Sequence, residues 1–150
     1  MNGLSVADFI TQIKSTYTVK ESVFLKAEKE DEIGMYLDGK CYLLRAKKGS
    51  YADDCVNRLD PTILSNNILT PILGIEDEKT NKNISFVAGN TPIDEIKEKV
   101  NTGEYAVAFI LKPIPIKALK EVADKGEIMP PKSTYIEPKL RSGLTIYPID

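Results

Sequence analysis

The feature that most constrains the fold is the dipeptide Asp38-Gly39, which stands between two largely apolar runs, 32–37 and 40–46. Asp and Gly both tolerate a positive φ angle, which the two central residues of a type I′ turn require. Such a turn matches the right-handed twist of the strands on either side of it. The sequence therefore predicts a β-hairpin over 32–46, and with it an antiparallel part of a sheet.

Four segments combine helical spacing of apolar residues with signals for a helix start or stop. Ser5 begins the first in a capping-box-like sequence, Asp60 is expected to cap the second with Pro61 in its first position, and Thr91 is expected to cap the third. Glycines follow the last three segments, as is typical of helix ends. We therefore expect helices over 5–15, 60–73, 92–101 and 116–125.

Two further strands are expected, and their arrangement decides the fold class. Residues 83–88 favour a strand, and 105–111 is apolar at nearly every position, which is typical of a strand buried on both faces. We expect 105–111 in the centre of the sheet. The helix between the two suits a right-handed crossover between parallel neighbours. The sequence thus predicts one α+β domain over 1–150, with a mixed sheet and three to four packed helices.

The composition excludes several classes of function. None of the 150 residues is a histidine, which excludes Ser-His-Asp and Cys-His nucleophiles and histidine-containing metal sites. A net charge of −2 disfavours nucleic-acid binding. No apolar run approaches a membrane span and residues 1–20 lack a signal-peptide pattern, so we expect a cytoplasmic protein without a membrane partner. Cys41 and Cys55 are expected to be ordinary reduced cysteines.

The segment 129–143 differs from the rest of the chain. It holds three prolines, three basic residues and three Ser or Thr hydroxyls, and we expect an ordered, extended loop, followed by a final strand over 143–149. From 112 to 141 there are seven basic and four acidic residues, a charge of +3, which leaves −5 elsewhere. Positive potential beside backbone N–H groups that are free of helix or sheet pairing favours an anion.

The candidate anion-binding or phosphate-binding residues lie in this loop. Their cations and hydroxyls could converge on a phosphate or carboxylate through charge-assisted hydrogen bonds. They are Lys132, Ser133, Thr134, Lys139 and Arg141.

Other interpretations of these polar residues stay open. The loop lacks the upstream glycines of a phosphate-binding P-loop, and it could equally be a proline-stiffened loop with solvated cations. Glu137 could neutralise Lys132 or Lys139 and make the segment a structural clasp. Asp53 and Asp54 could bind a magnesium ion, but an exposed acidic pair is more often solubilising, so no metal site is predicted.

The segment 129–144 resembles the closing signature of the domain-of-unknown-function 1015 family of bacteria and archaea. Further similar segments precede it in the family's order, and practically the whole chain is covered. Ile136 stands where the family usually has an aromatic residue, and Pro115 where it has a small polar helix cap. The other similar segments are 39–45, 59–64, 72–75, 108–113 and 122–126.

The resemblance implies that the chain corresponds to the C-terminal third of longer proteins, as a fragment or as a naturally short member. The front portion of that family carries an Asp-Gly-His-His-Arg motif, similar to ParB-like and sulfiredoxin-like domains, some relatives of which are nucleotide-dependent kinases of free serine. None of that motif is present here.

Two functional hypotheses follow. In the first, the chain contributes a phosphate-binding loop to a nucleotide-dependent small-molecule kinase, with a nucleotide as the cofactor of the full-length protein and no turnover by this chain alone. In the second, it is a non-catalytic structural or interaction domain. Its partner would then be the N-terminal portion of the family protein or a second copy of the chain.

Overall fold

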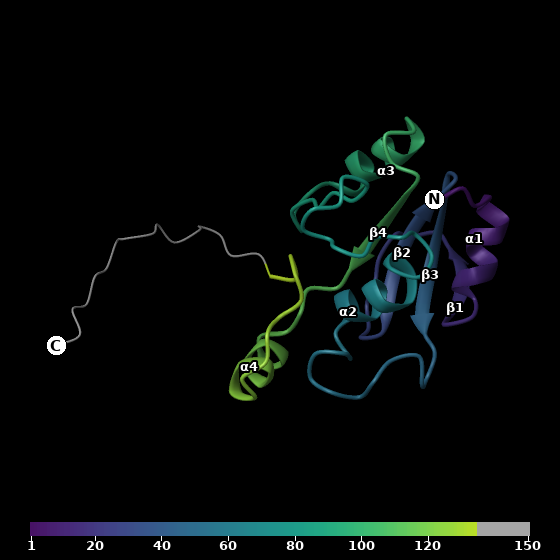
Figure 1. Cartoon of the computed structure of the whole chain (residues 1–150). Helices are drawn as coiled ribbons and strands as arrows, with labels where there is room; N and C mark the ends of the chain where they lie inside the picture. The colour runs from purple at the N-terminus through teal and green to yellow at the C-terminus, as the bar shows by residue number, and fades with distance from the viewer. Residues whose placement is uncertain (135–150) are drawn as a thin grey trace.

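The computed structural model describes residues 1–134, which form an α+β fold around a four-stranded sheet with the order β1-β3-β2-β4 (Figure 1). The elements, in chain order, are α1 (Val6–Ile13), β1 (Tyr17–Ser22), β2 (Glu32–Leu37), β3 (Lys40–Ala46), α2 (Asp60–Leu64), the π-helical segment η1 (Ser65–Leu69), α3 (Ile93–Asn101), β4 (Val107–Leu111) and α4 (Ile116–Asp124).

The predicted hairpin is confirmed as β2 and β3. Their antiparallel register runs from Leu37 opposite Lys40 to Glu32 opposite Arg45. Asp38 and Gly39 have φ angles of 50° and 75°, as a type I′ turn requires. The strand β1, which the sequence analysis did not single out, pairs antiparallel with the other edge of β3. Its Tyr-Thr-Val start has the β-branched and aromatic composition of a strand.

The expected arrangement of the later strands is wrong in three respects. Among residues 1–134, 83–88 form coil, β4 stands at the edge of the sheet rather than in its centre, and the three strand pairs are antiparallel. β4 reaches the sheet by pairing with β2, Leu111 opposite Ile33 and Val107 opposite Leu37. Strand propensity at 83–88 is a weak local preference, and without a neighbouring backbone to pair with it does not produce a strand.

The four helices are confirmed with shorter bounds, and two caps differ from the expectation. Ser5 caps α1, because its hydroxyl oxygen accepts a hydrogen bond from the Asp8 N–H at 3.2 Å. The N-cap of α2 is Leu59, and Asp60 instead accepts a hydrogen bond from the backbone N–H of Asp31 at 3.0 Å. The N-cap of α3 is Pro92 rather than Thr91.

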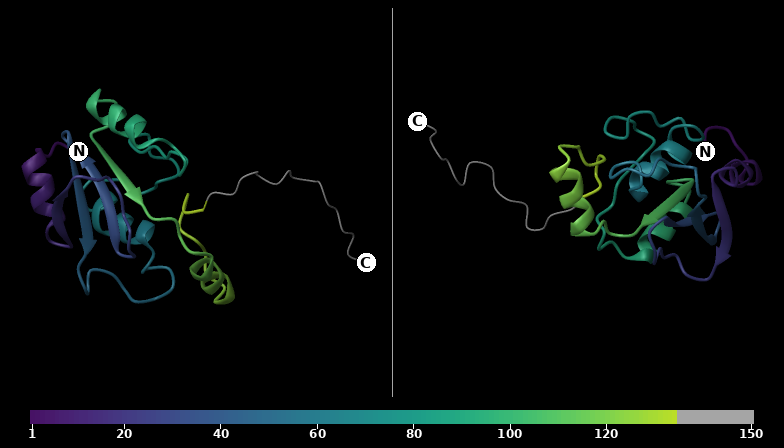
Figure 2. Two further views of the ribbon diagram at one scale, coloured as in Figure 1. Left: turned by 180° about the vertical axis from the view of Figure 1, so that it is seen from behind. Right: turned by 90° about the horizontal axis from the view of Figure 1, so that it is seen from below.

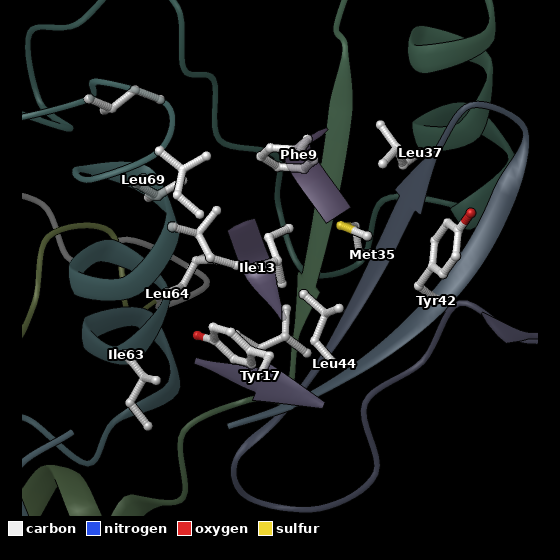
Figure 3. Packing of buried hydrophobic residues seen from close by; sticks show 14 residues of the cluster. Phe9, Ile13, Tyr17, Met35, Leu37, Tyr42, Leu44, Ile63, Leu64 and Leu69 are labelled. Carbon is white, nitrogen blue, oxygen red and sulfur yellow. The ribbon is translucent and has the colours of Figure 1, made fainter. Parts of the chain in front are cut away.

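The main core lies between one face of the sheet and the layer of α1, α2 and η1 (Figure 3). Phe9 and Ile13 of α1 and Ile68 of η1 are completely buried there. From the sheet, Met35 and Leu44 point into the same layer and have no exposed surface. The apolar stripe predicted for 60–73 therefore does cover the sheet, although the helix that carries it changes from α to π geometry at Ser65.

The opposite face of the sheet is covered by α3 and by the loop between β1 and β2. Tyr36 of β2 donates a hydrogen bond to Asn101 of α3 at 2.9 Å, and Leu25 of the loop is buried against it. Gly34 allows this loop to approach, since a Cβ there would lie 3.3 Å from the Lys26 backbone nitrogen and 3.4 Å from Ile110. β2 is consequently buried at all six positions.

Beyond the C-terminal end of β4, α4 packs on residues that precede α2 rather than on the sheet (Figures 1 and 2). Val122 is buried against Cys55 and Leu59, and Arg58 forms an ion pair with Glu121. Both cysteines are buried and free, as expected.

The position of the core predicts that two neighbouring leucines of β3 contribute very differently to the free energy of unfolding. Leu44→Ala removes a completely buried side chain and should lower the free energy of unfolding by about 2–5 kcal/mol. Leu43→Ala, on the other face and only half-buried, should cost clearly less. Urea unfolding followed by circular dichroism measures both, and equal losses would contradict this placement of the core.

Candidate functional site

The described part of the predicted anion loop forms a compact turn. The Ser133 hydroxyl donates a hydrogen bond to the Pro130 carbonyl at 2.7 Å, and the Ser133 N–H approaches the same oxygen at 3.4 Å. Lys132 has a φ of 56°, which is uncommon for a residue with a side chain. Lys132 and Thr134 are exposed. Lys139 and Arg141, like the expected strand over 143–149, lie outside the described residues.

Residues of this turn line an apolar groove of about 290 Å³, which no pattern in the sequence predicted. These residues are Pro131, Lys132 and Ser133. The groove therefore brings part of the predicted site together with residues from four other parts of the chain. No local signal could have found it, since its walls are up to about seventy residues apart along the chain.

The floor of the groove is the free edge of β4. Within residues 1–134, β4 pairs with β2 on one side and has no neighbouring strand on the other. Both of its faces are nonetheless covered by apolar residues. Val107, Phe109 and Leu111 contact the main core, and Ala108 and Ile110 contact the cluster under α3. All five residues of β4 stay half-buried, and all five line the groove.

Two walls rise above this edge, one from each face of the sheet. Leu64, Leu69 and Leu73 belong to α2, η1 and the turn after them, on the side of the main core. Ile96 and Val100 belong to α3, on the opposite side. A molecule in the groove would therefore meet apolar side chains above and below the plane of the sheet.

The third wall is the coil 83–87, which runs on the side of β4 that faces away from β2 (Figures 1 and 2). Phe86 and Val87 of this coil are 44% and 48% exposed. Within the described chain, no backbone group of residues 84–87 takes part in a backbone hydrogen bond. Among residues 1–134, the coil and the outer edge of β4 thus both border the groove with backbone groups that form no backbone hydrogen bond.

The charged residues of the groove are few. Lys99 forms an ion pair with Glu104 at 3.5 Å, and Lys132 has no ion-pair partner among residues 1–134. Glu78 is the one carboxylate among the described lining residues. The formal charges of the described lining sum to +1, but Lys99 is neutralised by Glu104, so Lys132 is the lysine that an acidic group of a ligand could approach.

A second polar cluster lies beside the start of α2, outside the groove. Asp60 accepts a hydrogen bond from Asp31, and Tyr51 donates a hydrogen bond to the Asp31 carboxylate at 2.9 Å. Burial raises the pKa of Asp60 to about 6, and the negative charges of Asp31 and Glu30 add to that effect. No local pattern in the sequence reveals this pair, because 29 residues separate its members.

The structural role of this cluster is clear from its contacts. Asp60 ties α2 to the start of β2, so the carboxylate positions the helix. Of the acidic pair Asp53 and Asp54 that the sequence did single out, Asp54 has structural contacts, since it accepts hydrogen bonds from the N–H groups of Val56 and Asn57. Across residues 1–134, no three His, Cys, Asp or Glu side chains form a cluster that could hold a metal ion.

Searches for related proteins gave no match to a family model, to a curated protein or to a solved structure. The resemblance to the domain-of-unknown-function 1015 family therefore stays a prediction. Of the helices described, none is long and apolar enough to cross a membrane.

The raised pKa of Asp60 predicts the pH dependence of stability. Between its unfolded pKa, about 4, and its folded pKa, about 6, the folded state binds more protons, so the free energy of unfolding falls as the pH rises through this window. Asp60→Asn keeps an acceptor for the Asp31 N–H but cannot ionise. It should stabilise the protein at pH 7.5 by on the order of 1 kcal/mol, and this gain should vanish near pH 4.

Urea unfolding at both pH values measures this effect. Asp124→Asn, at an exposed position, controls for the loss of one negative charge. If Asp60→Asn destabilises the protein equally at pH 4 and pH 7.5, ionisation of Asp60 does not lower the free energy of unfolding.

Proposed function

We propose that this chain is a non-catalytic interaction domain that takes up an extended segment of another polypeptide as an added strand on β4. The observation that carries the proposal is the unpaired outer edge of β4. Both faces of Val-Ala-Phe-Ile-Leu are covered by apolar residues, yet within the described residues the strand has no neighbour on the side away from β2.

The chemistry of the groove supports a polypeptide ligand. A row of unpaired backbone N–H and C=O groups at a sheet edge is matched best by the backbone of another strand, whose side chains then fill the neighbouring apolar surface. An exposed apolar edge is also a liability for aggregation, and natural proteins usually protect such edges. A bound strand would remove that liability and bury Phe86 and Val87.

Binding of a short strand-forming peptide tests the proposal. The probe is acetyl-Glu-Thr-Val-Thr-Ile-Thr-Glu-amide, named here the alternating peptide, whose terminal acids complement the charge of the groove. The full chain should bind it, and Phe86→Asp should weaken binding at least about tenfold by placing a charge in the apolar wall. Isothermal titration calorimetry gives both affinities.

The matched control is Phe24→Asp. Phe24 is also a phenylalanine with a largely exposed side chain, 76%, but it lies in the loop after β1 and does not line the groove. This variant should bind the alternating peptide as the parent chain does. Equal weakening by both substitutions would overturn the proposal, and so would failure of the parent chain to bind any strand-forming peptide.

A second proposal is a phosphate-binding role for the loop, as the resemblance implies. The observation in its favour is the turn at Pro130, which holds Lys132 exposed beside Ser133. Against it, the Ser133 hydroxyl already donates its hydrogen to a carbonyl. The geometry therefore favours the interaction function.

Titration of the full chain with ATP, ADP and phosphoserine tests the phosphate-binding proposal. Lys132→Ala should weaken a phosphate complex about tenfold or more, because a charge-assisted hydrogen bond contributes roughly 1.5–3 kcal/mol. Lys117→Ala, which removes an exposed lysine of α4 outside the groove, is the control. An unchanged phosphate affinity in Lys132→Ala would rule out this role for the lysine.

A further inference from the structure

We infer that the incoming segment inserts between β4 and the coil 83–87, pairs with both, and is an uninterrupted apolar run, free of proline, with acidic residues beside it. The inference rests on the proposed function and specifies its partner. It commits to a segment of another polypeptide as the occupant of the groove.

Backbone groups without backbone partners border the groove on two sides among the described residues. β4 offers one unpaired edge, and the coil 83–87 lines the same groove with backbone groups that form no backbone hydrogen bond in the described chain. The sequence of this coil, Asn-Ile-Ser-Phe-Val, favours a strand. What it lacks is a neighbouring strand, and an inserted segment would supply one. The ligand backbone would then donate and accept hydrogen bonds on both edges, which proline cannot do.

The second argument concerns the side chains of the ligand. Successive residues of a strand point to opposite faces of the sheet. Here both directions meet apolar walls, Leu64 and Leu69 on one face and Ile96 and Val100 on the other. A strand that alternates between apolar and polar residues would bury polar groups against one of these walls. A ligand that is apolar at every central position avoids this cost.

The third argument is charge. Lys132 stands at the groove beside the turn at Pro130, and Lys99 lines the wall formed by α3. Lys99 is already paired with Glu104, which leaves Lys132 as the lysine of the described lining that has no ion-pair partner among residues 1–134. Acidic residues flanking the apolar run would complement it and would also keep such a segment soluble before it binds.

The first experiment compares two peptides on the full chain. The two-faced peptide, acetyl-Glu-Val-Val-Ile-Ile-Val-Glu-amide, should bind at least about tenfold more tightly than the alternating peptide. Replacing its terminal acids by lysine should weaken binding, and Lys132→Ala should reduce that preference for acids. If the alternating peptide binds as tightly as the two-faced peptide, one face of the groove is not used and the inference fails.

The second experiment removes the amide hydrogens of the two-faced peptide one at a time by N-methylation. A strand paired on one edge loses affinity only at every second position. A strand paired on both edges should lose about tenfold or more at every central position, since each N–H then has a partner. An alternating pattern would overturn the insertion and leave the proposed function standing. Failure of both peptides to bind would overturn the proposed function itself.

Hydrogen exchange of the full chain identifies a competing occupant. In the free protein, the amides of 84–87 should exchange rapidly, and the two-faced peptide should protect them together with the unpaired amides of β4. Protection of both segments before any peptide is added would mean that the chain itself or a second copy already fills the groove. That outcome would overturn the inference of a strand from another protein.

Discussion

The pairing of β2 on both of its edges holds the sheet together. β2 is hydrogen-bonded to β3 and to β4, and all six of its residues are buried. α1, α2 and η1 cover one of its faces, and α3 with the loop before β2 covers the other. Gly34 is part of this arrangement, because a larger residue would press against the loop backbone and Ile110.

The burial of β2 includes one charged side chain, Glu32, whose desolvation is offset by hydrogen bonds. Glu32 is 3% exposed, yet it forms an ion pair with Arg45 and accepts hydrogen bonds from the N–H groups of Glu28 and Lys29. Burial alone would raise its pKa, but the hydrogen bonds from Arg45 and these two N–H groups outweigh burial and lower it. The carboxylate thus anchors the loop that covers Gly34, and Asp60 anchors α2 from the other side.

β4 differs from β2 in that its faces are covered but its outer edge has no neighbouring strand among the described residues. Its side chains are covered above and below by helices that are fixed by the rest of the fold, while its outer edge faces a groove. The coil beyond the groove has strand-like residues but no strand partner. Within the described residues this space has apolar faces, backbone groups without backbone partners on two sides and one exposed lysine, which is why we propose an extended polypeptide segment as its ligand rather than a small phosphorylated molecule.

The sequence by itself determined the local features: the hairpin at Asp38-Gly39, the Ser5 cap, the four helical stripes and a strand within 105–111, of which Val107–Leu111 form β4. Each depends on residues within a turn or two of one another. Tertiary structure alone decided that β4 pairs antiparallel with β2, that 83–88 stays coil, and that Lys132 and Ser133 join a groove with α2, α3 and β4. The physical reason is that strand order and grooves depend on which distant backbones meet, and a periodicity of apolar residues marks a buried face without naming the neighbour that buries it.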